Sequence, residues 1–187
     1  MEVKGRALKS IQKYVREKFG QEGFDRWLSA ISTEAYMVYS QSIDANAWFP
    51  LKTMLIAPMA NVAQLFYGWN LKDAAWDFGR YSADFGLKGP YRLLIKIGSP
   101  TFFVQKSSEF MSAYYRPSAI ETTEYRDGFG VVRITKFPEI DKTIEYRIGG
   151  WIERALEING CKDVKVEITK SLTTFDLYTE LKITWSA

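Results

Sequence analysis

The sequence contains no histidine and one cysteine, Cys161, among 187 residues. Without histidine there is no Ser-His-Asp or Cys-His nucleophile and no imidazole to act as an acid or base near neutral pH. Histidine-ligated zinc and histidine-ligated haem are excluded for the same reason. One cysteine cannot close an intrachain disulfide or build a four-cysteine metal site. We therefore expect a reducing, cytoplasmic environment and a packing role for Cys161.

Only residues 53–71 form a charge-free stretch long enough to span a membrane. Its apolar side chains, however, recur at helical spacing, at Leu51, Leu55, Met59, Val62 and Phe66. We expect a buried core helix here and no membrane span. The first six residues have no apolar signal core, so we expect no secretion.

The composition is otherwise that of a folded protein, with 47% hydrophobic and 25% charged residues. We expect one domain over residues 1–187. The net charge of +3 comes from the N-terminal segment, where four bases share one helical stripe: Arg6, Lys9, Lys13 and Arg16. We interpret this stripe as the solvated face of an amphipathic helix, with an acidic partner, a lipid surface or nucleic acid as alternatives. Its basic density is too low to predict nucleic-acid binding.

The segment before about residue 117 predicts mainly helices. Apolar periodicity and end signals place them over 4–19, 22–31, from Trp48-Phe49-Pro50 onward with a break at Pro58, 72–85, and from Ser99-Pro100 to Tyr115. Gly20 ends the first, and Asn70 is a candidate N-cap for the fourth.

After Pro117 the pattern alternates. Strands are predicted over 119–125 and 129–137 around Asp127-Gly128, and over 163–172 and 175–185 around Thr173-Thr174, with a helix over 141–158 between the pairs. The predicted class is α+β, with a helical half (about 1–117) packed on a four-stranded antiparallel sheet and a crossing helix (about 118–187).

Catalytic motifs are missing from the sequence. Gly128-Phe129-Gly130 is followed by Arg133 where a phosphate-binding loop needs glycine. Glu153 and Glu157 lie beside Arg154 and predict an ion-pair face rather than an acid–base pair. Bases likewise interleave with Asp73, Asp77 and Asp84, which argues for solvation rather than a cation site. We expect no enzyme and no metal site.

Aromatic residues are abundant, with 6 Trp, 11 Tyr and 12 Phe. Such residues usually fill a core, but together they also suit a cavity for a flat or long apolar ligand. We predict a ligand-binding pocket that draws on Trp48, Met59, Phe66, Trp76, Phe102, Phe110, Tyr114 and Trp151.

The order of the pieces resembles a known superfamily. A helix opening Ser99-Pro100-Thr101 and closing Tyr115-Arg116-Pro117 is followed by a hairpin, a helix containing Gly149-Gly150-Trp151, and a second hairpin ending at Trp185. This resembles the superfamily of haem nitric-oxide/oxygen-binding (H-NOX) domains, TRAPP tethering subunits and vinyl-reductase-type sensors, and most closely an uncharacterised bacterial family within it. The resemblance implies an apolar cavity between the helical half and the sheet.

The haem-binding features of H-NOX domains do not carry over. The proximal histidine belongs early in the helix after Ser99-Pro100, where this sequence has Thr101-Phe102-Phe103. The Tyr-x-Ser-x-Arg clamp for the propionates belongs after the first hairpin strand, and residues 132–137 do not contain it. The zinc-binding cysteine cluster of some sensor members is also missing. We therefore expect no cofactor, haem included.

The sequence and the resemblance together predict a non-enzymatic sensor domain that binds a small apolar ligand and signals through a protein partner or a homodimer. One alternative is a ligand-free interaction module, like TRAPP subunits, with the cavity filled by side chains. A second is a reductase that uses a nicotinamide or flavin cofactor, although no motif supports it.

Overall fold

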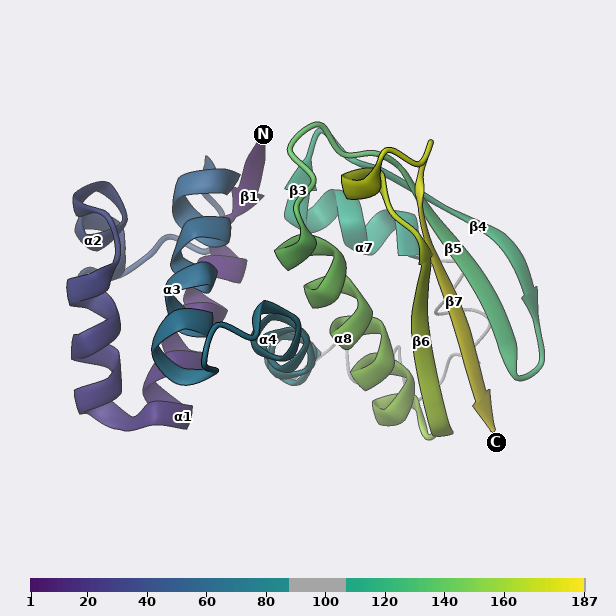
Figure 1. Cartoon of the computed structure of the whole chain (residues 1–187), viewed down its shortest axis with the longest axis horizontal. Coiled ribbons are helices and arrows are strands. Elements are labelled where there is room, and N and C mark those ends of the chain that lie inside the picture. The colour runs from purple at the N-terminus through teal and green to yellow at the C-terminus, as the bar shows by residue number, and fades with distance from the viewer. Residues whose placement is uncertain (88–106, 187) are drawn as a thin grey trace.

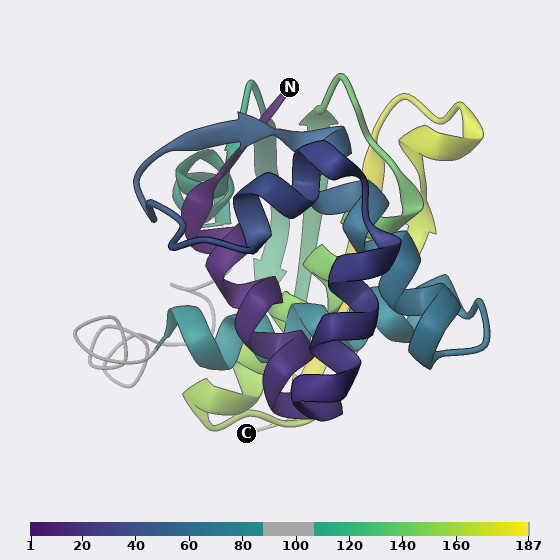
Figure 2. The same ribbon diagram turned by 90° about the vertical axis from the view of Figure 1, so that its left-hand side faces the viewer.

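The chain forms a helical layer and a sheet layer, as shown in Figure 1 for the computed structural model, which describes residues 1–87 and 107–186. The helical layer comprises α1 (Gly5–Ala30), α2 (Thr33–Tyr39), the π-helical turn η1 (Lys52–Ile56), α3 (Ala57–Phe66) and α4 (Leu71–Gly86). Figure 2 looks onto these helices, with the strands behind them. The predicted α+β class is confirmed.

The sheet layer contains four antiparallel strands in the order β4-β5-β7-β6. They are β4 (Ala119–Arg126), β5 (Phe129–Lys136), β6 (Lys162–Lys170) and β7 (Thr179–Ser186), accompanied by α7 (Ser107–Tyr114), α8 (Lys142–Asn159) and the 3-10 turn η2 (Leu172–Thr174). Both α7 and α8 lie on the side of the sheet that faces the helical layer (Figure 1). The alternation in β7 buries Leu181, Ile183 and Trp185.

The break inside α1 and the start of α2 follow from local chemistry. Leu8, Ile11 and Val15 are buried on one side of α1. Gly20, the predicted end, has φ +73°, which glycine adopts at little cost, and the chain continues as one element with a break at this point. The short helix α2 was not predicted; the Ser32 side chain caps it by accepting a hydrogen bond from the Ala35 N–H.

A second, three-stranded sheet also corrects the sequence analysis. It has the order β2-β1-β3 and consists of β1 (Glu2–Lys4), β2 (Trp48–Pro50) and β3 (Tyr115–Arg116). The segment Trp48–Pro50, predicted to open a helix, is therefore an edge strand, where the missing N–H of Pro50 is tolerated. The helix starts after it as η1, and Pro58 lies in the first turn of α3 without ending it.

The two predicted hairpins differ in outcome. The β4–β5 turn falls at Asp127-Gly128 as predicted, and Gly128 has φ +71°. The β6–β7 connection is longer than a tight turn at Thr173-Thr174, because β6 ends at Lys170 and η2 intervenes before β7.

The α4–α8 crossing joins the two layers. A Cβ at Gly79 would lie 2.2 Å from the Arg147 carbonyl oxygen, and one at Gly150 would lie 2.1 Å from the Trp76 carbonyl oxygen. Both helices therefore need glycine where their backbones meet. Salt bridges flank the crossing: Arg80 with Glu153, Arg80 with Glu157 at 2.8 Å, and Arg154 with Asp84 at 3.1 Å. The acids predicted to form an ion-pair face thus pair mainly across helices.

Gly150→Ala should lower the free energy of unfolding by about 1–3 kcal/mol, because the added methyl group must push the Trp76 backbone away. Helix propensity alone predicts the opposite sign, with alanine favoured by about 1 kcal/mol. Urea unfolding measures the difference. The control is Ala60→Gly at an exposed position of α3, which should cost about 1 kcal/mol. A Gly150→Ala protein as stable as the parent would contradict the close crossing.

Candidate functional site

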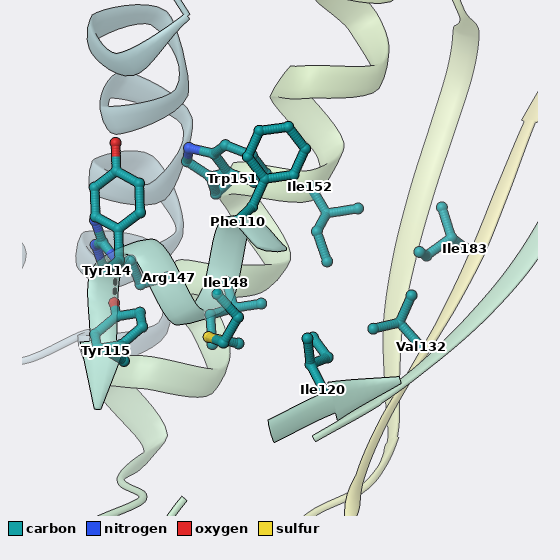
Figure 3. Close-up of a pocket in the computed structure, with 11 residues that line it drawn as sticks. Phe110, Tyr114, Tyr115, Ile120, Val132, Arg147, Ile148, Trp151, Ile152 and Ile183 are labelled. Atoms are coloured by element: carbon teal, nitrogen blue, oxygen red, sulfur yellow. Dashed lines mark hydrogen bonds between the residues drawn. The ribbon is translucent and has the colours of Figure 1, made fainter. Parts of the chain in front are cut away.

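An apolar pocket lies between α7, α8 and the face of the sheet that they cover (Figure 3). Its volume is about 60 Å³. It is lined by Phe110, Met111, Tyr114, Tyr115, Ile120, Val132, Arg147, Ile148, Trp151, Ile152 and Ile183. A water molecule occupies about 30 Å³ and a cavity of about 150 Å³ binds benzene, so a larger ligand requires the walls to move apart.

The two helices α7 and α8 and the four-stranded sheet position most of the lining through their periodicity. On α8, the residues at 147, 148, 151 and 152 have helical spacing and share one face. On α7, Phe110 and Tyr114 lie four residues apart, and the Phe110 ring centroid is 5.5 Å from that of Trp151. The sheet supplies the branched side chains Ile120, Val132 and Ile183, which lie at the opposite end of the pocket from Tyr115 in Figure 3.

One end of the pocket is polar. Arg147 is buried, with 4% of its surface exposed. Its Nη1 group donates a hydrogen bond to the Tyr115 hydroxyl, and its Nη2 group donates one to Ser82 Oγ at 3.5 Å. Its Nε atom is buried without a hydrogen-bond partner. Burial raises the pKa of Tyr115 although the positive charge of Arg147 opposes the shift, so the phenol keeps its proton at neutral pH.

The arginine is a buried cation whose hydrogen-bond partners in the described part of the chain are neutral hydroxyls. It also lies beside aromatic rings, with its guanidinium carbon 5.1 Å from the Phe78 ring centroid and 5.6 Å from that of Tyr115. Leaving a buried charge without an ionic partner typically costs about 3–5 kcal/mol. Arg147 is therefore the most unusual chemical feature of the pocket.

Three of the predicted ligand-binding residues, Phe110, Tyr114 and Trp151, come together in this pocket. Four others lie elsewhere, and Phe102 lies outside the described residues. Met59 is fully buried in α3, the Phe66 ring stacks on Phe19 with centroids 4.0 Å apart, and Trp76 packs against Gly149. Trp48 lies under two cations, Lys4 and Arg116.

Sequence reasoning missed the rest of the lining for different reasons. Ile148 and Ile152 carried a signal, since their spacing with Trp151 marks the inner face of α8. Arg147 carried none, because an arginine on a helix is ordinarily solvated.

A wider, more polar cleft opens between α4 and β6 and contains a hydrogen-bonded cluster. The Asp77 carboxylate accepts hydrogen bonds from Tyr14 at 2.6 Å, from Tyr67 at 2.7 Å and from Lys18. Burial acts to raise the pKa of Asp77, but the hydrogen bonds from Lys18, Tyr14 and Tyr67 outweigh it, so the pKa lies below its usual value. Asp77 is thus held as an ion rather than poised for proton transfer.

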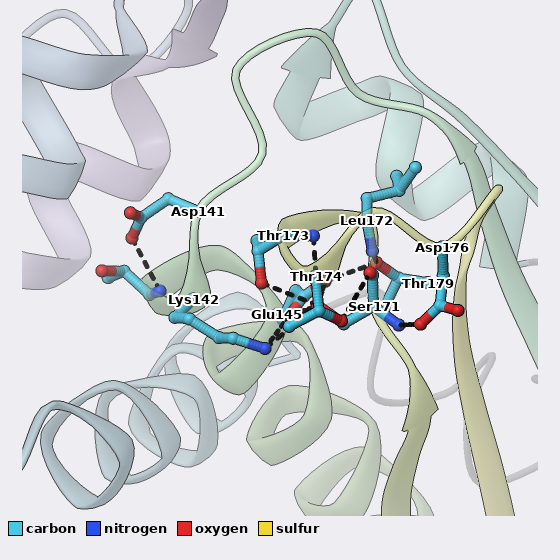
Figure 4. Close-up of polar contacts among 10 residues, drawn as sticks. Asp141, Lys142, Glu145, Ser171, Leu172, Thr173, Thr174, Asp176 and Thr179 are labelled. Carbon is cyan, nitrogen blue, oxygen red and sulfur yellow. Dashed lines mark hydrogen bonds and ion pairs between the residues drawn. The ribbon is translucent and has the colours of Figure 1, made fainter.

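A second polar cluster pairs a serine with a lysine (Figure 4). In some enzymes the lysine of such a pair is the base that activates the serine as a nucleophile. Ser171 Oγ lies 3.0 Å from Lys142 Nζ, but it also lies 2.8 Å from both carboxylate oxygens of Glu145 and accepts from the Thr173 N–H at 3.1 Å. Glu145, fully buried, also accepts from Thr179. The Ser171 hydroxyl is buried and engaged on several sides, so it is not free to act as a nucleophile. The cluster instead holds the β6–β7 connection against α8.

The carboxylates considered as cation ligands lie within the described residues 1–87 and 107–186. No group of three or more His, Cys, Asp or Glu side chains there is placed to hold a metal ion. Asp73 bonds to Asn70, Asp77 to Lys18 and Asp84 to Arg154, each away from a shared centre. Within the same ranges, every helix is too short or too polar to cross a membrane.

The N-terminal basic stripe lies on the outer side of α1. Lys13 pairs with Glu17 at 3.4 Å, with both side chains about half exposed, and the Arg16 guanidinium carbon is 4.0 Å from the Phe24 ring centroid. Lys13 Nζ also lies 5.6 Å from the Phe85 ring centroid of α4, and the solvated face stays a prediction.

No family model and no curated protein matches this sequence. Several solved structures, however, have a similar fold. An H-NOX protein from Shewanella oneidensis in the Fe(II)NO ligation state has a TM-score of 0.77 at 14% identity, covering 98% of this chain and 99% of that one. A variant H-NOX domain from the same organism, in the Fe(II)CO state, has a TM-score of 0.73 at 14% identity, with 97% and 98% covered. A protein from work on haem redox potential and porphyrin distortion has a TM-score of 0.67 at 14% identity, with 98% and 99% covered. The chain therefore has the H-NOX fold, as its resemblance predicted.

The expectation of no cofactor is contradicted, since the proteins that share this fold are iron- and haem-bearing proteins. The expectation relied on the missing histidine and the missing propionate clamp, whereas methionine and tyrosine also serve as axial haem ligands. The pocket presents such donors in Met111 and Tyr114, together with Arg147 as a cation for a carboxylate. The donor chemistry thus fits a haem group, although the 60 Å³ space must widen to receive it.

The acid stability of the protein should depend on Asp77. Its pKa is lowered in the folded protein, so its stabilising contribution is complete above the ordinary value of 3.8 and is lost as the pH falls through the folded pKa. The difference in unfolding free energy between the parent and Asp77→Asn should shrink on acidification from pH 6 to pH 3, as measured by urea unfolding. Asp127→Asn, in an exposed turn that accepts asparagine equally well, is the control. A difference that stays constant over this range would contradict the assignment.

Proposed function

We propose that this protein is a ligand-binding sensor domain whose ligand enters the pocket between α7, α8 and the sheet. The observation that carries the proposal is an almost entirely apolar cavity with one buried cation at its edge. Apolar walls with a few fixed polar groups are typical of small-molecule sites. Two of the similar proteins are described in Fe(II)NO and Fe(II)CO ligation states, and a third comes from work on haem redox potential.

Haem is accordingly the first ligand to test. When bound, it supplies an iron atom that can take a diatomic gas. From the described pocket, Met111 and Tyr114 are the side chains able to bind iron, because the Tyr115 hydroxyl is engaged by Arg147. The apolar side chains of α8 and the sheet would contact the macrocycle and exclude water.

We propose that occupancy is signalled through α7. We expect a ligand larger than about 60 Å³ to press on α7, which forms one wall of the pocket. α7 continues directly into β3, β3 pairs with β1, and β1 leads into α1. The Arg116–Glu2 salt bridge, at 2.6 Å, spans the same β1–β3 pair. A shift of α7 is thereby transmitted to the helical layer, where a partner or a second copy would detect it.

The proposal assigns no reaction to the domain. The ionisable side chains that line the described pocket are two tyrosines and one arginine. Burial raises the pKa of Tyr115 and holds it in its protonated form, so Tyr115 does not provide a base at neutral pH.

Ligand binding should raise stability by a calculable amount. A ligand at about 100 times its dissociation constant adds about 2.7 kcal/mol to the free energy of unfolding. We expect such an increase for one of two probes, hemin or hexanoate, measured by urea unfolding, with native mass spectrometry to confirm the complex. Ile152→Phe, which fills the pocket, should abolish it.

Ile56→Phe is the matched control, because it makes the same exchange in η1, away from the pocket. It should leave ligand-dependent stabilisation intact. If neither probe stabilises the parent, the result favours the ligand-free interaction module instead.

The interaction module has one observation of its own, an exposed apolar pair in the β6–β7 connection. Phe175 is 99% exposed and Leu177 is 88% exposed. Phe175 also has φ +67°, a left-handed conformation that costs a residue with a Cβ about 1–2 kcal/mol. Packing does not compensate for this strain, so a partner surface would account for a large ring at this position.

Phe175→Gly should therefore not destabilise the fold, and should raise its unfolding free energy by up to about 1 kcal/mol, since glycine adopts positive φ freely. Thermal unfolding of both proteins is the measurement. A loss of more than about 1 kcal/mol would mean that the ring supports the fold. Leu177→Ser, exposed nearby with no positive φ, should be neutral and serves as the control.

A further inference from the structure

We propose that Arg147 and Tyr115 bind the carboxylate of an apolar carboxylic acid whose hydrocarbon part occupies the pocket. This inference rests on the proposed function, because it specifies the chemistry of the ligand that the pocket receives. It starts from the unmatched buried charge of Arg147.

The guanidinium of Arg147 has unused donors. Arginine carries five N–H groups, and in the described part of the chain Arg147 makes hydrogen bonds from Nη1 to Tyr115 and from Nη2 to Ser82. The Nε–H is buried with no partner at all. Ser82 Oγ already donates to the Gly79 carbonyl oxygen at 2.9 Å. The side chain is thus surrounded by groups that cannot neutralise it.

The acidic residues nearby on α4 and α8 are engaged elsewhere. Glu145 bonds to Ser171 and Thr179, and Glu153 and Glu157 bond to Arg80. Asp84 bonds to Arg154. Within residues 1–87 and 107–186, none of these carboxylates forms a salt bridge with Arg147. An external anion would supply the missing partner.

The surroundings define the class of that anion. Arg147 is the only cation among the described lining residues, so it matches a single negative charge. A guanidinium fork binds the two oxygens of a carboxylate in parallel. Tyr115 adds a second donor, because its hydroxyl accepts from Arg147 and its own proton remains available. The opposite walls are formed by Ile152, Val132 and Ile183, which suit a hydrocarbon chain or ring.

The same chemistry has two sources, a free aliphatic or aromatic acid and the carboxylate of a porphyrin. The experiment compares hexanoate with hexanamide, benzoate with benzamide, and hemin with its dimethyl ester, by isothermal titration on the full chain. We expect the acid to bind about 10- to 100-fold more tightly than its neutral partner in at least one pair, and that pair identifies the source.

Arg147→Met should remove this preference, so that the acid binds no more tightly than its neutral partner. It should also keep or raise the stability of the ligand-free protein, because it eliminates an unpaired buried charge, whereas a purely structural arginine would destabilise when replaced. Arg147→Lys, which keeps the charge without the planar fork, and Tyr115→Phe, which loses one donor, should each retain part of the preference.

Equal binding of acid and neutral partner by the parent would overturn the inference and leave the proposed function in place. Failure of every probe to bind would overturn both. If Arg147→Met does not fold, the other two variants decide. An undiminished preference for the acid in both Arg147→Lys and Tyr115→Phe would overturn the proposal that these two residues bind the carboxylate.

Discussion

The whole arrangement depends on how closely α4 and α8 approach each other. Glycine at 79 and 150 lets the two backbones touch, and any larger residue would separate them. Because this contact fixes α8 against the helical layer, it also sets which face of α8 is turned toward α7 and the sheet. The pocket and the buried arginine are consequences of that one crossing, since Arg147 contributes its carbonyl to the contact and its guanidinium to the pocket.

Local sequence signals predicted the elements they control. Asp141 and Gly160 bound α8, where the Asp141 side chain accepts from the Thr143 N–H and Gly160 has φ +107°. Asp127-Gly128 placed the first hairpin. The three-stranded sheet left no such signal, because β1 has three residues and pairs with Trp48–Pro50 and Tyr115–Arg116, both far along the chain. Pairing of this kind is decided by tertiary packing rather than by a local pattern.

The candidate site was predicted only in its aromatic part. Phe110, Tyr114 and Trp151 meet as expected, yet equally large rings such as Phe66 and Trp76 pack elsewhere, because cores and pockets select the same residue types. The polar end could not be foreseen, since burial of Arg147 follows from the helix crossing. The expectation of no cofactor failed for a related reason: it considered the histidine and clamp positions of H-NOX domains rather than the donors that the fold assembles.

The strand order has a consequence for association. β4 and β6 form the two edges of the larger sheet, and register shifts occur in the β4–β5 and β6–β7 pairs, whereas the central β5–β7 pair runs in even register. Exposed charges line the same edges, with Glu121 and Glu124 on β4 and Lys165 and Lys170 on β6. Bulges and charges at an edge hinder the docking of another strand. These features disfavour edge-to-edge strand pairing between copies of the protein. The helices and loops are therefore the surfaces left for contacts with other molecules.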